Sequence, residues 1–135
     1  MGTVTFFDTS AFVAVLANEP DRDRFLEAID AADRCMTSPL VRLETCIVLS
    51  RRLDFSLRAA EAQFNRFLEE AAISEIEVTS AIGAAAVACY ASFGKGRHPA
   101  RLNFADCFSY ACAKAHDAFL VFKGDDFAQT DINRG

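Results

Sequence analysis

The chain opens with the stretch VTFFDTSAF, residues 4–12, in which an apolar run meets an aspartate and two hydroxyl residues. Residues 4–7 are apolar and rich in strand-forming side chains, so they predict a short buried strand. Each side chain of residues 8–10 has an oxygen that is able to cap a helix, and a helix is predicted over residues 11–17. A buried strand followed at once by a helix is the usual beginning of an α/β fold.

The same alternation of strand and helix continues along the chain. Further helices are predicted over residues 20–32, from Ser38, from Ser56, over 80–93 and over 103–115, and further strands over 35–37, 76–78 and 118–122. Ser38 is followed by Pro39, which is a typical helix start with serine as the cap and proline in the first turn. Strands separated by helices indicate a three-layer α/β domain, with a central parallel sheet of four to five strands flanked by helices.

Composition favours one folded domain over residues 1–135. The chain is 52% hydrophobic and 24% charged, with a net charge of −5, which argues against bulk coating of nucleic acid. Its longest apolar stretch, residues 81–93, falls well short of the roughly 20 residues that span a bilayer, so we expect no membrane anchor. Five cysteines without C-x-x-C spacing or an even count predict reduced core thiols in a cytoplasmic protein.

Glu44 stands out because its helical neighbours at three and four residues in each direction are all apolar: Leu40, Val41, Ile47 and Val48. This pattern predicts that the carboxylate faces inward. Burying an ionised carboxylate without a partner costs several kcal/mol. Glu44 is therefore expected to be protonated, bound to a cation, or paired with one of three nearby arginines, Arg42, Arg51 or Arg52.

Other acids stand near the ends of predicted elements. Asp8 and the pair Asp125 and Asp126 follow strands, so they should share the carboxyl edge of the sheet, where sites form in such folds. Asp106 lies in the first turn of a helix. Taken singly, these residues also have structural interpretations: Asp8 as a helix cap, Asp106 as part of a capping box, and the pair as turn formers.

Convergence of Asp8, Glu44, Asp106 and Asp125 would form a carboxylate cage. Oxygen ligands without a histidine pair select Mg²⁺ or Mn²⁺ over zinc, and such a site suits metal-dependent phosphodiester hydrolysis. The chain contains no G-x-S-x-G or Walker A motif. An aspartyl-phosphate phosphatase is disfavoured because Ser10 stands where a D-x-D motif would have its second aspartate.

The segment GKGRHPAR, residues 94–101, carries basic side chains and no acid. This loop is a candidate for contact with a polyanion, although a solvated loop is the alternative. Phosphate contacts of this kind give affinity with little sequence preference.

Several motifs together resemble those of PIN-domain ribonucleases, and specifically VapC-like toxins of type II toxin–antitoxin pairs. They are FDTSA at residues 7–11, Glu44 in the helix after Ser38 and Pro39, YASFGKGRHPARLNFAD at 90–106, FKGDDF at 122–127, and TDI at 130–132. Their order and spacing cover nearly the whole chain.

The resemblance implies a Mg²⁺ or Mn²⁺ site and cleavage of single-stranded or looped RNA by a metal-activated water. Asp8, Glu44 and Asp106 match the family's acidic positions. Asp125 is the first choice for the fourth, with Asp126 as the alternative that braces the turn. Thr9 and Ser10 are expected to orient ligands or the water, while Lys95, Arg97, His98, Arg101 and Lys123 are expected to contact RNA.

The resemblance also implies two protein partners. One is a second copy of the chain, with which it forms a homodimer, and the other is a VapB-like antitoxin whose C-terminal segment enters the active-site groove. The alternative is a catalytically silent PIN-like interaction module that uses its acids only to bind a basic partner peptide.

Overall fold

A computed structural model describes residues 2–96, 98–124 and 126–134 of the chain. The elements follow one another in the order β1 (Val4–Phe7), α1 (Thr9–Leu16), α2 (Arg22–Ala31), β2 (Arg34–Thr37), α3 (Pro39–Arg52), α4 (Leu57–Glu70), β3 (Ile73–Glu75), α5 (Ser80–Phe93), α6 (Phe104–Ala115), β4 (Phe119–Val121) and the short 3-10 helix η1 (Asp126–Gln129).

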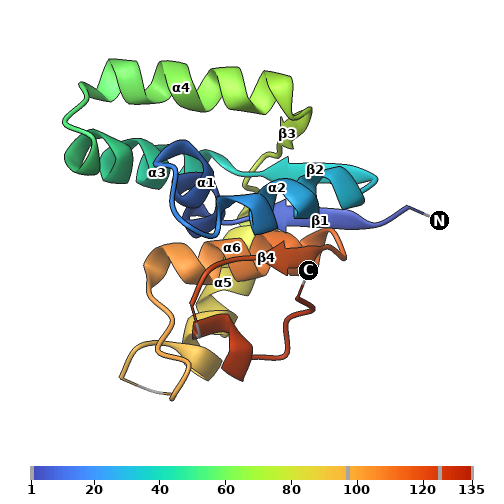
Figure 1. Ribbon diagram of the computed structural model, residues 1–135. Helices are drawn as coiled ribbons and strands as arrows, with labels where there is room; N and C mark the ends of the chain where they lie inside the picture. Colours follow the sequence, from blue (N-terminus) through green and yellow to red (C-terminus); the bar gives the residue numbers. More distant parts are fainter. Residues whose placement is uncertain (1, 97, 125, 135) are drawn as a thin grey trace.

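The described strands form one parallel sheet in the order β3-β2-β1-β4. The chain moves outward from β1 to β2 and β3, then crosses back to place β4 on the other side of β1. Right-handed crossovers put α1 to α4 on one face of such a sheet and α5 and α6 on the other. In Figure 1, α5 and α6 lie beside β4 in the lower half of the molecule, whereas α3 and α4 lie at the opposite end. The predicted three-layer parallel α/β fold is thereby confirmed.

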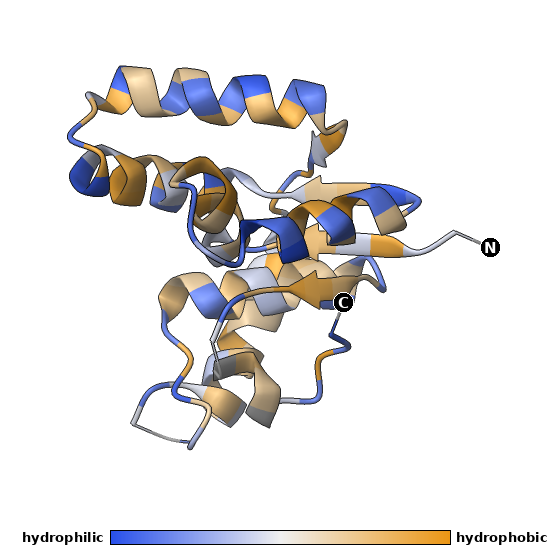
Figure 2. Cartoon of the chain, in the orientation of Figure 1, coloured by the Kyte–Doolittle hydropathy of each residue, from blue (hydrophilic) through white to orange (hydrophobic). Residues whose placement is uncertain are grey.

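Aromatic side chains fill the core between the sheet and its helices. Phe6 and Phe7 of β1, Phe12 of α1 and Phe64 of α4 are all 1% exposed or less. The rings of Phe12 and Phe64 pack with centroids 4.9 Å apart, which joins the first and fourth helices. In Figure 2 α4 alternates between apolar and polar bands, as expected for a helix with only one buried side.

Most predicted element starts are confirmed by their caps. The hydroxyl oxygens of Ser38 and Ser56 accept hydrogen bonds from the backbone N–H groups three residues later, at the beginnings of α3 and α4. The first helix begins at Thr9 rather than at residue 11, because Asp8 occupies the cap position.

The strand predicted over residues 76–78 is wrong, because β3 lies three residues earlier, at Ile73–Glu75. Its partner decides the position: β2 ends at Thr37, which pairs with Glu75, so a strand at 76–78 would extend beyond its neighbour. The buried residue Ile73 takes the core position.

All five cysteines are free and buried, as predicted. No helix in the described part of the chain is both long and apolar enough to cross a membrane.

Candidate active site

Asp8 lies where the order of the strands reverses, between the carboxyl ends of β1 and β4. Its backbone N–H donates a hydrogen bond of 3.1 Å to the carbonyl oxygen of Val121, the last residue of β4. Ligands of open α/β sheets bind in the crevice at such a reversal, because the connecting helices leave in opposite directions there.

The Asp8 side chain is held by two hydroxyl groups and does not cap α1. It is 6% exposed and makes no capping hydrogen bond. Its Oδ1 accepts a hydrogen bond of 2.7 Å from the Ser109 hydroxyl, and its Oδ2 a longer one of 3.4 Å from Ser10. Burial raises the pKa of Asp8, while the bond from Ser109 lowers it and the charge of Glu44 adds to the rise.

Ser10 also joins the first strand's end to the fourth. Its hydroxyl oxygen accepts a hydrogen bond of 2.7 Å from the backbone N–H of Lys123, which follows β4. Thr9 and Ser10 were expected to orient ligands or the water. In the structure each of their hydroxyl groups donates to a carboxylate of the site, Thr9 to Glu44 and Ser10 to Asp8.

Glu44 is half-buried, so the prediction that its carboxylate faces inward is confirmed only in part. The buried side of α3 consists of Val41, Thr45, Cys46 and Leu49, and Glu44 lies at the edge of that side. Its Oε1 accepts a hydrogen bond of 2.5 Å from the Thr9 hydroxyl.

The three nearby arginines do not neutralise Glu44 among the described ion pairs. Arg42 binds Glu61 and Glu75, and Arg52 binds Glu19. Arg51 is exposed.

Asp106 serves in the predicted capping box and also faces the site. Its Oδ2 accepts a hydrogen bond of 3.0 Å from the Asn103 N–H, and its own N–H donates to the Asn103 side chain over 2.9 Å. The residue is half-buried in the first turn of α6. This cap fixes the direction of the carboxyl group relative to the helix.

A single cavity of about 360 Å³ joins the three acids. It is lined by Asp8, Thr9, Ser10, Val13, Glu19, Glu44, Val48, Arg52, Asp106, Lys123 and Phe127. We call it the acidic cavity. Asp125 lies outside the described residues, and so does the Asp126 side chain, although the backbone of that residue begins η1.

The predicted cage is looser than expected. Over residues 2–96, 98–124 and 126–134, no three acidic, histidine or cysteine side chains come close enough to form a metal-binding group. The acids still fit a divalent cation by their chemistry, because they are all carboxylates and the pKa of Asp8 is raised by burial and by Glu44. Mg²⁺ keeps several of its waters, so such a site does not require every acid to touch the ion.

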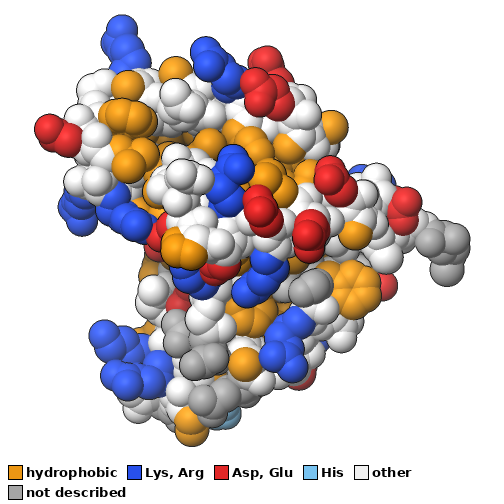
Figure 3. All heavy atoms as spheres, viewed as in Figure 1, with side chains coloured by type: hydrophobic (Ala, Val, Ile, Leu, Met, Phe, Trp, Pro, Cys, Tyr) orange, Lys and Arg blue, Asp and Glu red, His pale blue; other side chains and the backbone are white. Residues whose placement is uncertain are grey.

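The predicted RNA contacts are spread over more than one surface. Lys95 is exposed and lines a different hollow from the acidic cavity. His98 is half-buried, and its Nδ1 accepts a hydrogen bond from the Ala100 N–H. Arg101 is exposed, whereas Arg97 lies outside the described residues. Lys123 does line the acidic cavity, but its ammonium group binds Glu19 and Asp21. Figure 3 shows basic side chains gathered at the end of the molecule that carries the loop of residues 94–101.

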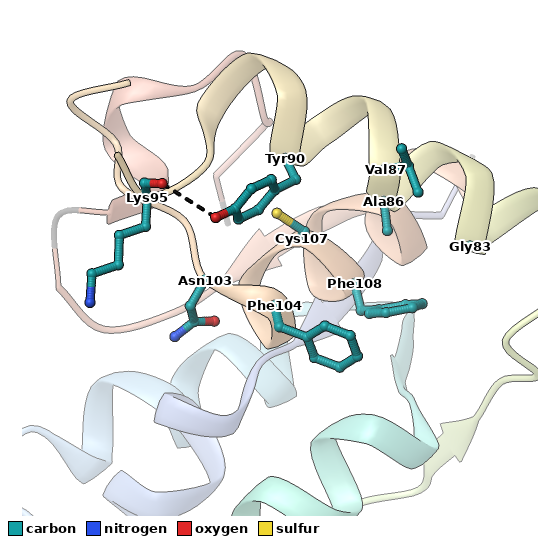
Figure 4. A pocket seen from close by; sticks show the side chains of 9 residues that line it. All are labelled: Gly83, Ala86, Val87, Tyr90, Lys95, Asn103, Phe104, Cys107 and Phe108. Atoms are coloured by element: carbon teal, nitrogen blue, oxygen red, sulfur yellow. Dashed lines mark hydrogen bonds between the residues drawn. The ribbon is translucent and has the colours of Figure 1, made fainter. Parts of the chain in front are cut away.

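The second hollow lies between α5 and α6 and is mostly apolar. Figure 4 shows the rings of Phe104 and Phe108 along one side, Val87 on the neighbouring helix, and the Tyr90 hydroxyl donating to the Lys95 carbonyl oxygen over 3.3 Å. Val87 and Phe104 are each 71% exposed. No acid lines this hollow within the described part of the chain.

The sequence reasoning missed Ser109 and Glu19 as polar residues of the site, and it considered Arg52 only as an ion-pair partner of Glu44. Ser109 is three residues after Asp106, so both lie on one face of α6. Arg52 follows Glu44 by eight residues, which puts both on one stripe of α3. Helical spacing from the acids was thus the signal that could have identified two of them.

This fold and this cavity define an α/β protein with an acidic site at the strand reversal, and residues 5–133 match the PIN domain family. The chain belongs to that family. PIN-domain ribonucleases depend on divalent metals.

The relatives narrow the class to VapC-like members. Ribonuclease VapC30 of Mycobacterium tuberculosis is 42% identical over 125 residues, which cover 93% of each chain. A VapC ribonuclease of Rhizobium meliloti is 36% identical over 141 residues, covering 96% of this chain and 99% of the relative. The chain is therefore a VapC-like PIN-domain protein, as the sequence motifs predicted.

Solved structures agree on the fold. The sarcin-ricin loop cleaving toxin VapC20 of Mycobacterium tuberculosis superimposes with a TM-score of 0.76 at 23% identity, covering 97% of this chain and 98% of that chain. VapBC2 of Rickettsia felis, bound to a DNA fragment from its promoter, gives a TM-score of 0.75 at 15% identity, covering 98% of this chain and 96% of that chain.

Proposed function

We propose that this protein is an endoribonuclease that acts as the toxin of a toxin–antitoxin pair and cleaves single-stranded or looped RNA. The observation that carries the proposal is the buried Asp8 at the strand reversal, facing Glu44 and Asp106 in one cavity of a PIN-family chain. We further propose that these three acids, together with Asp125, hold Mg²⁺ or Mn²⁺. We also propose that residues 1–135 form a single PIN-like domain.

The chain's own residues prepare the carboxylates for that task. The Ser109 hydroxyl donates to Asp8 and favours its ionised form, which opposes the effect of burial on its pKa. The Thr9 hydroxyl holds the Glu44 carboxylate, and the Asn103 N–H holds that of Asp106. When bound, a divalent cation lowers the pKa of a water and offsets negative charge on the phosphate.

The proposed partners are RNA, a VapB-like antitoxin and a second copy of the chain. Relatives named VapC ribonucleases and a solved Klebsiella pneumoniae toxin–antitoxin complex of the same fold support the antitoxin. Exposed apolar side chains on α3, α5 and α6 support protein contacts: Leu43, Val87 and Phe104. The five free cysteines suit a cytoplasmic location.

The test is cleavage of a labelled single-stranded RNA and a labelled hairpin RNA by the purified chain, with Mg²⁺, with Mn²⁺ and with a chelator. We expect cleavage only with added metal, and its loss in Asp8→Asn and Asp106→Asn. Asp54→Asn is the matched control, because Asp54 is exposed and lies outside the acidic cavity. Melting curves check that each variant is folded.

Metal-independent cleavage, or equal cleavage by Asp106→Asn and Asp54→Asn, would contradict the proposal. A folded protein that cleaves no RNA of a broad panel yet binds a basic peptide would favour the silent interaction module.

A further inference from the structure

A cluster of four charged side chains lies at the rim of the acidic cavity. Glu19 binds the Arg52 guanidinium over 2.5 Å and the Lys123 ammonium over 3.0 Å, and Lys123 also binds Asp21 over 3.2 Å. Three of these residues, Glu19, Arg52 and Lys123, line the cavity beside the site acids. Figure 3 shows acidic and basic side chains next to one another across the middle of this face.

Glu19 is held firmly by the way α1 ends. Asn18 adopts a left-handed conformation with φ 53°, and the Glu19 N–H donates to the Ala14 carbonyl oxygen over 2.8 Å. The Asn18 N–H donates to Val15, which completes a Schellman motif. The Glu19 side chain is only 13% exposed, and its pKa is lowered chiefly by the bond from Arg52. Arg52 therefore extends from α3 toward an anchored carboxylate.

The cavity needs cations if it is to receive RNA. Asp8, Glu44 and Asp106 would repel a phosphodiester, and a metal ion at these acids offsets charge only in its own neighbourhood. Arg52 and Lys123 are the basic side chains among the described residues that line the cavity.

Arg52 is better suited to a phosphate than Lys123. The Lys123 ammonium already binds two carboxylates, whereas the guanidinium has five N–H donors in a planar fork and one described bond, to Glu19. Half of the Arg52 side chain, 49%, is exposed. Donors therefore remain for the oxygens of a bound phosphate.

The helix sets where that phosphate would lie. Glu44, Val48 and Arg52 follow one another at intervals of four residues on α3, and all three line the cavity. Eight residues at 1.5 Å each separate the backbone positions of Glu44 and Arg52 by about 12 Å along the axis. Arg52 is thus placed for a different phosphate from the one that faces the acids.

We propose that Arg52 binds a backbone phosphate of the RNA beside the scissile one, and that Glu19 positions its guanidinium. This inference rests on the proposed nuclease function. Arg52 is a substrate-binding residue in this view, and Glu19 is a positioning residue that acts through it.

The test compares Arg52→Ala with Arg51→Ala, which removes the same charge from the neighbouring exposed residue. Binding of a fluorescein-labelled single-stranded RNA of mixed sequence is measured by anisotropy in a chelator, over a series of salt concentrations. We expect Arg52→Ala to bind about five- to tenfold more weakly, with a salt slope smaller by about 0.7, as for one lost phosphate contact. Arg51→Ala should match the wild type in both.

Kinetics with metal give a second readout. Arg52→Ala should raise KM with little change in kcat, and Glu19→Gln should raise KM by a smaller factor because the cation remains. Arg52→Gln, which keeps the Cβ, Cγ and Cδ carbons and removes the charge, should reproduce the binding defect if Arg52→Ala proves poorly folded.

Equal affinity and salt slope in the Arg52 variants and Arg51→Ala, with a wild type that cleaves RNA in a metal-dependent manner, would overturn this inference and leave the proposed function intact. A wild type without metal-dependent cleavage would instead overturn the proposed function, and this inference with it.

Discussion

Ser109→Ala is the substitution whose effect the structure allows us to work out most fully. Ser109 is 1% exposed, and its hydroxyl donates to the buried Asp8 carboxylate over 2.7 Å. Alanine keeps the backbone and Cβ and deletes one oxygen, so the helix and the packing of its neighbours should change little. The main loss is a hydrogen bond to a charged acceptor within the protein.

The expected size follows from that bond. Hydrogen bonds to charged groups contribute about 1.5–3 kcal/mol, and Asp8 would keep only the longer bond from Ser10 among its described side-chain partners. We therefore expect the free energy of unfolding to fall by about 2 kcal/mol. For a chain of 135 residues this corresponds to a decrease of about 6–10 °C in Tm.

Thermal and urea unfolding in a chelator measure this loss, and a double-mutant cycle with Asp8→Asn isolates its cause. A neutral amide accepts a weaker bond, so Ser109→Ala should cost about 1 kcal/mol less in the Asp8→Asn background. Ser50→Ala is the control, because Ser50 is half-buried and its hydroxyl donates to a neutral acceptor, the Ile47 carbonyl oxygen. It should cost about 0.5 kcal/mol.

The cost of Ser109→Ala in free energy of unfolding should also depend on pH. The folded-state pKa of Asp8 is raised, so ionising Asp8 removes stability as pH rises from its unfolded pKa through its folded pKa. Ser109 opposes that rise, and its deletion should raise the pKa of Asp8 further. The loss caused by Ser109→Ala should thus be full above the folded pKa and smaller at pH 4.

Two results would refute this account. The first is an equal cost of Ser109→Ala in the wild-type and Asp8→Asn backgrounds. The second is a loss that stays the same from pH 4 up to the highest pH at which the protein remains folded. Either result would mean that the hydroxyl does not act through the Asp8 charge.

Further predictions concern metal, stability and assembly. Mg²⁺ at about ten times its dissociation constant should stabilise the wild type by about 1.4 kcal/mol, and Asp8→Ala by clearly less. Arg42→Ala should lower the free energy of unfolding by about 1–2 kcal/mol in urea titrations, because Arg42 bonds both Glu75 oxygens, at 2.9 and 2.8 Å, and joins α3 to β3. Phe104→Glu should weaken the proposed homodimer about tenfold or more, measured by light scattering across a dilution series, because Phe104 is 71% exposed beside the apolar hollow.

Each of these has a comparison that decides it. Equal metal-induced Tm shifts in the wild type and Asp8→Ala would argue against Asp8 as a ligand. Arg58→Ala, at an exposed position of α4, should leave stability nearly unchanged. Leu57→Glu is the control for Phe104→Glu, because it adds the same charge at a residue that is 56% exposed and outside the hollow. If both variants dissociate the dimer equally, the hollow between α5 and α6 is not the dimer interface.

Local chemistry explains why much of the fold was predictable. Residues 4–7 are rich in strand-forming side chains and form β1, while Ser38 and Ser56 cap their helices through hydroxyl groups three residues from their partners. Such features depend on neighbours in the chain, so the sequence reveals them. The acids Asp8 and Asp106 were recognisable for the same reason, since each stands at the beginning of a helix.

Other features depend on residues far apart in the chain. The exposure of Glu44 follows from how α3 is rotated against its neighbours, and helical periodicity alone predicted too much burial. The place of β3 follows from where β2 ends, and the alternating segment Ile76-Glu77-Val78 just after β3 misled the prediction.

The sequence by itself therefore determined the order of the elements, the parallel α/β class and the acidic side chains of the site, because capping, periodicity and charge are local properties. Only the tertiary structure decided which groups serve those acids. Ser109 donates to Asp8 although the two residues are 101 positions apart in the chain. Arg52, at the end of α3, binds Glu19, which follows α1. Both contacts form because the crossovers of the sheet bring α1, α3 and α6 together around the end of β1. Those contacts depend on the angles between packed elements, which no stretch of the chain specifies alone.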